Sequence, residues 1–124
     1  MDKKQYDVII IGAGPGGIFA AYELAKKAPE LKVAVFEAGN SLEKRKCPID
    51  GKKIKSCINC KTCAIMSGFG GAGAFSDGKY NITNDFGGTL YEYIGKDTAI
   101  DLMKYVDEIN LAYGGEGTKM YSTA

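Results

Sequence analysis

The hydrophobic pattern of the first forty residues predicts a strand, a helix and a second strand. Residues 6–11 form a run rich in β-branched side chains, which is typical of a buried parallel strand rather than of an alternating surface strand. From Pro15 onward apolar side chains recur at helical spacing, and Pro29 ends this helix at or before Ala28. Residues 31–36 form a second strand, and the helical crossover requires it to run parallel to the first.

The rest of the chain predicts an irregular middle and a helical end. Residues 40–64 lack periodicity and hold all four Cys and seven Lys or Arg, which indicates an ordered excursion. Residues 67–88 contain seven Gly, with residues 80–83 as a possible short strand. Asp97 then suits the N-cap of an amphipathic helix that glycines from Gly114 onward close. The expected apolar face of this helix is Ala99, Leu102, Met103, Val106, Ile109 and Tyr113.

Together these elements predict an α/β fold class, with a Rossmann-like βαβ unit, a Cys- and Gly-rich excursion and an incomplete parallel sheet. We expect the βαβ unit at residues 1–39, the Cys-rich basic loop and Gly-rich segment at 40–88, and a C-terminal helical segment at 89–124. A chain of 124 residues that is 45% hydrophobic and 25% charged corresponds to one globular domain, here a partial one. Parallel sheets normally need both faces covered, so two strands predict exposed apolar surface and self-association, or association with the remainder of a longer protein.

Charge and composition exclude several classes of function. Sixteen Lys and Arg stand against fifteen Asp and Glu, so the net charge of +1 gives no argument for a nucleic-acid or membrane partner. The lysines of residues 40–64 also lack the interleaved aromatic side chains that base stacking needs. The chain has no His, which excludes Ser-His-Asp and Cys-His catalytic units and imidazole metal ligands within it. Its longest early apolar run, residues 8–11, is too short for a signal peptide or a membrane span, so we expect a cytoplasmic protein.

The segment Gly12–Gly17, of sequence G-A-G-P-G-G, matches G-x-G-x-x-G between the first predicted strand and the helix. In that context the first Gly makes a tight turn, the second lets the backbone approach a pyrophosphate, and the third packs the helix on the strand. The helix N-terminus supplies N–H groups and a positive dipole end for phosphates. Glu37 ends the second strand, where an acidic side chain accepts hydrogen bonds from a ribose diol. The alternatives are a turn that only packs the helix on the sheet, and a methyltransferase-type nucleotide turn.

Two sets of motifs carry a resemblance to known flavoproteins. Residues 6–17 and 36–39 resemble the FAD-binding opening of the two-dinucleotide-binding-domain flavoproteins. More narrowly, Cys47-Pro48, the Cys run at 57–63 and the Gly-rich run at 66–79 look like a family of poorly characterised NAD(P)/FAD-dependent dehydrogenases. Members of that family are several times longer, which implies that this chain is an N-terminal fragment. The resemblance implies an FAD-dependent oxidoreductase with an unknown small-molecule substrate and, in the full-length family, NAD(P)H as a possible electron donor.

The resemblance also implies which residues contact FAD. The glycines of the turn would face the pyrophosphate, Glu37 the adenosine ribose, and the Gly-rich segment the isoalloxazine, with Ser76 and Asp77 nearby. Arg45, the only Arg, would approach the cofactor, because a guanidinium suits bidentate phosphate contact. The candidate cofactor contacts are Gly12, Gly14, Pro15, Gly16, Gly17, Glu37, Ala38, Arg45, Gly70, Gly71, Ala72 and Gly73. The alternatives are a solvated charge for Arg45 and a plain surface loop for the glycines, and no catalytic acid or base is assigned.

Cys57, Cys60 and Cys63 form C-x-x-C-x-x-C, a spacing that lets one loop direct three thiolates to a common centre, and Cys47 is a candidate fourth ligand. Iron–sulfur clusters and tetrahedral zinc both suit these ligands, although the Cys-Pro precedes the triplet instead of following it as in bacterial ferredoxins. The alternatives are a redox-active pair stabilised by neighbouring lysines and four reduced thiols without a ligand. The rivals to a flavoprotein are therefore a non-enzymatic metal-binding module and an inactive truncated fragment.

Overall fold

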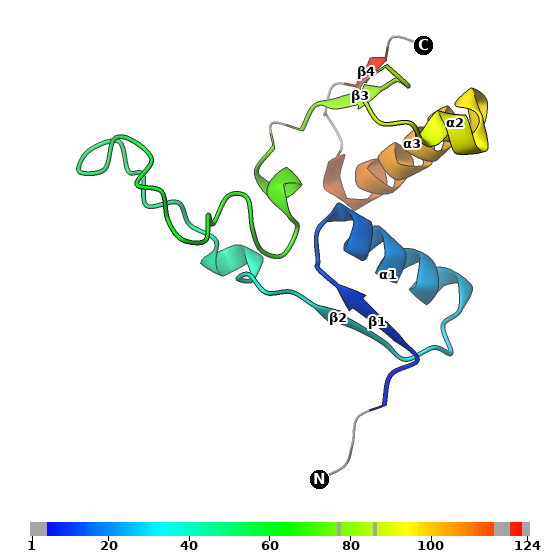
Figure 1. The fold of residues 1–124 in the computed structure, drawn as a ribbon, viewed down its shortest axis with the longest axis horizontal. Helices are drawn as coiled ribbons and strands as arrows, with labels where there is room; N and C mark the ends of the chain where they lie inside the picture. Colours follow the sequence, from blue (N-terminus) through cyan, green and yellow to red (C-terminus); the bar gives the residue numbers. More distant parts are fainter. Residues whose placement is uncertain (1–4, 77, 86, 116–119, 123–124) are drawn as a thin grey trace. The chain divides into compact units, whose positions relative to one another are not determined.

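The computed structural model describes residues 5–76, 78–85, 87–115 and 120–122 (Figure 1). The chain divides into two compact units, residues 1–76 and residues 77–124. The boundary between the units, after Ser76, lies inside the expected segment 40–88 and within its Gly-rich run at 66–79.

The first unit begins with strand β1 (Val8–Ile11), helix α1 (Pro15–Lys27) and strand β2 (Val33–Phe36). The two strands pair in parallel, with Val8 opposite Val33 and Ile11 opposite Phe36. The Gly12 N–H continues the ladder by donating to the Phe36 carbonyl oxygen at 2.7 Å. The mixed α/β class and the parallel pairing are thus confirmed, within a sheet of two strands.

The sequence sets both ends of α1. Pro15 stands at the first helical position, where its missing N–H costs no helical hydrogen bond. Lys26 and Lys27 lie in the last turn, where cations are favoured by the helix dipole, and Lys27 pairs with Glu23 at 2.7 Å. The Ala28 N–H donates to Leu24, and Pro29 follows.

The sheet of the first unit is covered on one face. Helix α1 lies along both strands (Figure 1), and Val8 and Ile10 are half-buried. Ile9 and Ile11 point to the other face and are 57% and 82% exposed. Within the first unit the prediction of a strand buried on both faces is therefore wrong, because no described element of that unit covers the second face. The expected exposed apolar surface is confirmed.

After β2 the chain forms the short 3-10 helix η1 (Leu42–Lys44), a long loop that leaves the sheet and returns, and the 3-10 helix η2 (Ala72–Phe75) (Figure 1). The loop contains a tight turn in which one carboxylate oxygen of Asp50 accepts from the Lys52 N–H at 2.8 Å and the Ile54 N–H at 2.9 Å. These backbone donors hold the pKa of Asp50 below its ordinary value. The excursion therefore has local order without a regular element.

The second unit contains β3 (Tyr80–Ile82), α2 (Leu90–Ile94), α3 (Lys96–Asn110), a π-helical turn (Leu111–Gly115) and β4 (Met120–Ser122). Strands β3 and β4 pair in parallel. The predicted helix is present, but Gly95 is its N-cap and Asp97 lies in its first turn, so the prediction of Asp97 as the cap is wrong. An acidic residue in the first turn still favours the helix through its dipole.

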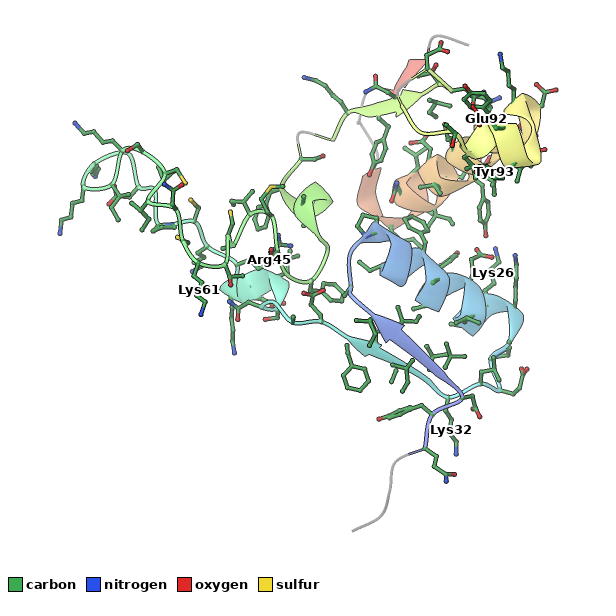
Figure 2. All side chains as sticks on the ribbon, in the orientation of Figure 1. Lys26, Lys32, Arg45, Lys61, Glu92 and Tyr93 are labelled. Atoms are coloured by element: carbon green, nitrogen blue, oxygen red, sulfur yellow. The ribbon has the colours of Figure 1, made fainter. Side chains whose placement is uncertain are left out.

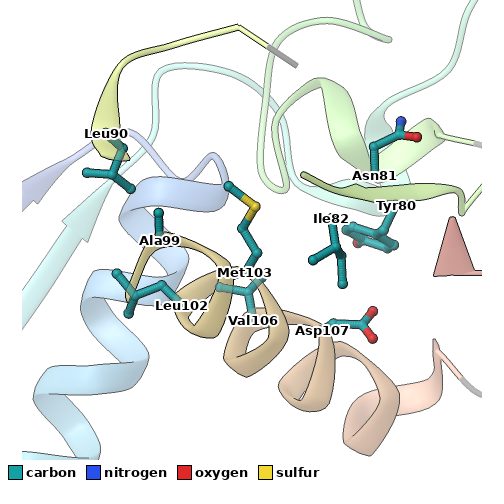
Figure 3. Close-up of a pocket in the computed structure, with 9 residues that line it drawn as sticks. All are labelled: Tyr80, Asn81, Ile82, Leu90, Ala99, Leu102, Met103, Val106 and Asp107. Atoms are coloured by element: carbon teal, nitrogen blue, oxygen red, sulfur yellow. The ribbon is translucent and has the colours of Figure 1, made fainter. Parts of the chain in front are cut away.

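The buried apolar residues of the second unit are Ile82 of β3 and Ala99 of α3. An apolar pocket of about 280 Å³ opens beside them, and Figure 3 shows the residues that line it. These residues are Tyr80, Asn81, Ile82, Leu90, Ala99, Leu102, Met103, Val106 and Asp107. Within the described ranges, none of the helices combines the length and apolar character that crossing a bilayer requires.

Candidate functional site

The glycine turn between β1 and α1 has the geometry that its sequence predicts. Gly12 has a φ of +95°, a conformation that residues with a side chain rarely adopt. A Cβ on Gly17 would overlap the Gly12 carbonyl oxygen and lie 3.2 Å from Ile10 Cγ2. The first and third glycines of the motif are therefore required by the fold itself.

The middle of the turn is open. A Cβ placed on Gly14 would meet nothing closer than Gly71 Cα at 4.0 Å, and one on Gly16 would meet nothing within 4 Å. The first helical hydrogen bond runs from the Ile18 N–H to the Gly14 carbonyl at 3.0 Å, so the N–H groups of Gly16 and Gly17 precede it. This bare backbone at a helix N-terminus suits a phosphate group.

Glu37 is fixed by two peptide N–H groups. Its Oε2 accepts from the Ala13 N–H at 2.8 Å and its Oε1 from the Gly39 N–H at 2.7 Å. These bonds, with a smaller contribution from the charge of Arg45, hold the pKa of Glu37 below its ordinary value of 4.5 although partial burial opposes the shift. A carboxylate has about four acceptor positions. Glu37 can therefore keep both backbone bonds and still accept from ribose hydroxyls.

Arg45 is 3% exposed and is the buried charged residue of the first unit. Its guanidinium donates to four backbone carbonyls: Nε to Ala64 at 2.8 Å, Nη1 to Phe69 at 2.6 Å and to Gly71 at 2.9 Å, and Nη2 to Ile65 at 2.7 Å. The guanidinium carbon also lies 4.8 Å from the centre of the Phe75 ring. Figure 2 shows Arg45 beside the short helix that follows β2. The alternative of a solvated charge is therefore wrong. Four of the five N–H groups of the guanidinium donate to backbone carbonyls of the loop.

The Gly-rich loop lies against the glycine turn. The Gly70 N–H donates to the Ala13 carbonyl at 2.8 Å, and the Phe69 N–H donates to the Asn40 carbonyl at 3.0 Å. A Cβ on Gly39 would lie only 2.5 Å from Gly68 Cα. The structure thus brings the turn, the end of β2 and the residues before η2 together, which are three of the segments that the sequence singles out.

The remaining residues predicted near a cofactor are more dispersed. Ala72 and Gly73 belong to η2 and are exposed. Pro15, the first residue of α1, and Ala38, two residues after β2, are exposed as well. Asp77 lies outside the described residues. Contact of any of these residues with a ligand stays a prediction.

The four cysteines are exposed free thiols. Among the described residues no three His, Cys, Asp or Glu side chains gather closely enough to hold a metal ion. Cys57 has one local partner: the Asn59 N–H lies 3.4 Å from its sulfur, and its thiol donates to Asn59 Oδ1 at 3.7 Å. Asn59 adopts the left-handed conformation with a φ of +53°. The metal site therefore stays a prediction that the arrangement of the thiols does not support.

Comparison with known proteins places the likeness in the N-terminal third of the chain. Residues 1–43 match the Thi4 family. The thiamine thiazole synthase of Yarrowia lipolytica is 64% identical over 40 residues, which are 32% of this chain and 13% of that protein. The thiamine thiazole synthase of Candida albicans is 54% identical over 42 residues, 33% of this chain and 12% of its own length. The matched part includes the whole βαβ unit, with the glycine turn and Glu37.

A third relative extends the likeness beyond the βαβ unit. An uncharacterized protein of Clostridium beijerinckii is 39% identical over 71 residues, 57% of this chain and 13% of that protein. The chain thus matches only about an eighth of the length of these relatives. No solved structure matches it. The two-dinucleotide-binding-domain family expected from the sequence is not confirmed by these comparisons.

Proposed function

We propose that residues 5–76 form the part of an FAD site that recognises the adenosine diphosphate moiety, in an FAD-dependent oxidoreductase of dehydrogenase type. The observation that carries the proposal is the hydrogen bond between the Glu37 carboxylate and the Ala13 N–H at 2.8 Å. It places an ionised acid at the end of β2 directly beside the glycine turn, as recognition of a ribose and its pyrophosphate requires. The Thi4 match covers residues 1–43, which include Ala13 and Glu37, and it supports a flavin-type site.

The arrangement suggests how the chain would hold the cofactor. The open backbone of Gly14 and Gly16 would receive the pyrophosphate, with the helix dipole of α1 behind it. Glu37 would accept from the ribose hydroxyls. When bound, the flavin supplies the hydride or electron chemistry, and the protein orients it. The substrate remains a small molecule of unknown identity, and neither NAD(P)H nor a metal gains support from the comparisons.

The direct test replaces Gly14 by Val. Gly14 has a φ of −77° and a Cβ there meets no atom closer than 4.0 Å, so the variant should keep its fold while its side chain fills the pyrophosphate position. We expect the FAD dissociation constant, measured by flavin fluorescence quenching, to rise at least about tenfold.

The matched control is Ala25→Val, because it places the same valine side chain at an exposed position in the second half of α1, away from the glycine turn. We expect its FAD affinity to stay within about twofold of the wild type. ADP should compete with FAD, and a 2′-phosphorylated ADP should compete less well because Glu37 is anionic. Unchanged FAD binding by Gly14→Val would overturn the proposal.

A second candidate function rests on the cysteine loop, which would bind zinc or an iron–sulfur cluster as a metal-binding module. The observation that favours it is the C-x-x-C-x-x-C spacing of Cys57, Cys60 and Cys63, whose thiols are all exposed and free on one loop. Zinc titration with and without Cys57→Ser and Cys60→Ser is the test. Equal zinc affinity of wild type and the double variant would remove this candidate.

A further inference from the structure

We propose that Arg45 is a positioning residue that holds residues 64–71 against the glycine turn, so that this loop forms a second wall of the dinucleotide site. This inference rests on the proposed function. It assigns Arg45 a role that acts through the loop backbone, whereas the sequence resemblance would have Arg45 meet the cofactor phosphates directly. The two roles predict different results when the guanidinium is replaced.

The first step is that the loop backbone contacts the glycine turn directly. Gly71 has a φ of +63°, and a Cβ on it would lie 3.2 Å from Gly14 Cα and 3.0 Å from Pro15 Cδ. Gly70 bonds the carbonyl of Ala13, the residue whose N–H holds Glu37. The loop backbone therefore borders the same peptide groups that would receive the pyrophosphate and the ribose.

The second step is that this placement depends on Arg45. The loop turns four carbonyl oxygens, those of Ala64, Ile65, Phe69 and Gly71, toward one point. Buried carbonyls without donors are costly, and a planar guanidinium supplies several donors in a fixed fork. A Cβ on Gly68 would lie 2.7 Å from Arg45 Cδ, so this glycine lets the Arg side chain pass directly beneath the loop.

The third step is that the charge of Arg45 serves the site as well. No carboxylate within the described residues forms an ion pair with Arg45; its charge is compensated by the carbonyl dipoles and the Phe75 ring. Its positive charge still reaches Glu37, where it favours the ionised carboxylate. A lysine would retain a charge but could not span four carbonyls from one ammonium group.

The test compares Arg45→Lys with Lys46→Ala, the substitution of an exposed neighbour in the same basic run. Hydrogen–deuterium exchange of residues 64–71 is measured first, without ligand. We expect exchange at the amides of Phe69 and Gly70 to quicken at least about tenfold in Arg45→Lys and to stay unchanged in Lys46→Ala. FAD titration should then show a dissociation constant raised at least about tenfold in Arg45→Lys alone.

The outcomes separate the roles. Weaker FAD binding with wild-type exchange would mean that Arg45 touches the ligand directly, which overturns the inference. Faster exchange with wild-type FAD affinity would mean that the loop is no wall of the site, which also overturns it. If the wild type itself binds no FAD, the proposed function fails, and the exchange experiment still decides whether Arg45 holds the loop.

A second variant keeps the inference testable if Arg45→Lys does not fold. Gly71→Ala leaves the guanidinium in place but introduces a methyl group against Pro15 and Gly14 at a left-handed backbone position. We expect faster exchange at Gly70 and weaker FAD binding in Gly71→Ala, with far-UV circular dichroism like that of the wild type. Exchange and affinity both at wild-type values would overturn the inference.

Discussion

Glu37 shows how an acidic side chain can be prepared for a ligand by the backbone alone. Each of its carboxylate oxygens accepts a hydrogen bond from a peptide N–H group. One donor is Ala13 in the turn before α1, and the other is Gly39, two residues after Glu37. These donors fix the orientation of the carboxylate and favour its ionised form. The side chain is thus held in place before any sugar hydroxyl arrives.

The ionisation of Glu37 predicts a pH dependence of stability. Its pKa in the folded chain lies below 4.5, so its contribution to the free energy of unfolding is fully present above pH 4.5 and is lost as the pH falls through the folded pKa. Glu37→Gln should therefore lower the melting temperature at pH 7, and the difference from the wild type should shrink below pH 4.5. Thermal melts across this range measure it, with the exposed Glu30→Gln as control. A difference that is constant with pH would contradict the assignment.

The site could be predicted from the sequence where its signal is local. The glycine turn and Glu37 follow from spacing within one βαβ unit, and the structure places them together. The role of Arg45 could not be predicted, because its four acceptors lie 19 to 26 residues further along the chain. The available signal was that Arg45 is the only Arg in a run of lysines, which indicates a need for a guanidinium but not its partner.

At the scale of elements, the segments with a clear hydrophobic pattern were predicted, and the short strand expected at residues 80–83 is confirmed as β3, whereas α2 and β4 were not predicted. The ranges of α1 and α3 follow from helical spacing bounded by Pro and Gly, and β1 and β2 from β-branched runs. Helix α2 has five residues and β4 has three, too few for a periodic signal. Their formation depends on tertiary neighbours, such as the pairing of β4 with β3.

The packing of β3 against α3 predicts that the stability of the second unit depends on the buried side chain of β3. Ile82 is 3% exposed and, like Ala99, lines the pocket of Figure 3. Ile82→Ala should lower the free energy of unfolding by about 2–4 kcal/mol, because it removes buried methyl groups and enlarges a cavity. Urea denaturation followed by tyrosine fluorescence measures the change. Tyr93→Ala, at an 83% exposed position, is the control and should change stability by no more than about 0.5 kcal/mol.

At the scale of the whole molecule, the exposed apolar side chains matter because contiguous apolar patches on a protein surface often mark where another chain packs. Large hydrophobic side chains are exposed in both units, on the open face of the β1–β2 sheet, in the excursion and in the second unit. Parallel sheets are normally covered on both faces. The open face is therefore where further chain or a second copy would be expected to pack.

This exposure predicts that association depends on the open face of the sheet. Ile11→Lys places a charge at an 82% exposed position and should change the stability of the chain by no more than about 0.5 kcal/mol. It should lower the average mass measured by sedimentation velocity, whereas Tyr93→Lys in the second unit should not. Equal association of Ile11→Lys and the wild type would show that the chain associates through another surface.

The hydrogen bonds of Arg45 have a consequence for the evolution of the chain. These bonds join the two ends of the excursion. Arg45 lies at the start of the excursion, and its acceptors Ala64 and Ile65 lie at its end. A loop whose ends are fastened to each other can change in length at little thermodynamic cost, because doubling a flexible loop costs only about 0.6 kcal/mol. Residues 46–63 can therefore acquire, lose or exchange a cysteine motif while the glycine turn, Glu37 and the returning loop keep their geometry. The excursion is the part of this unit in which relatives can diverge most freely.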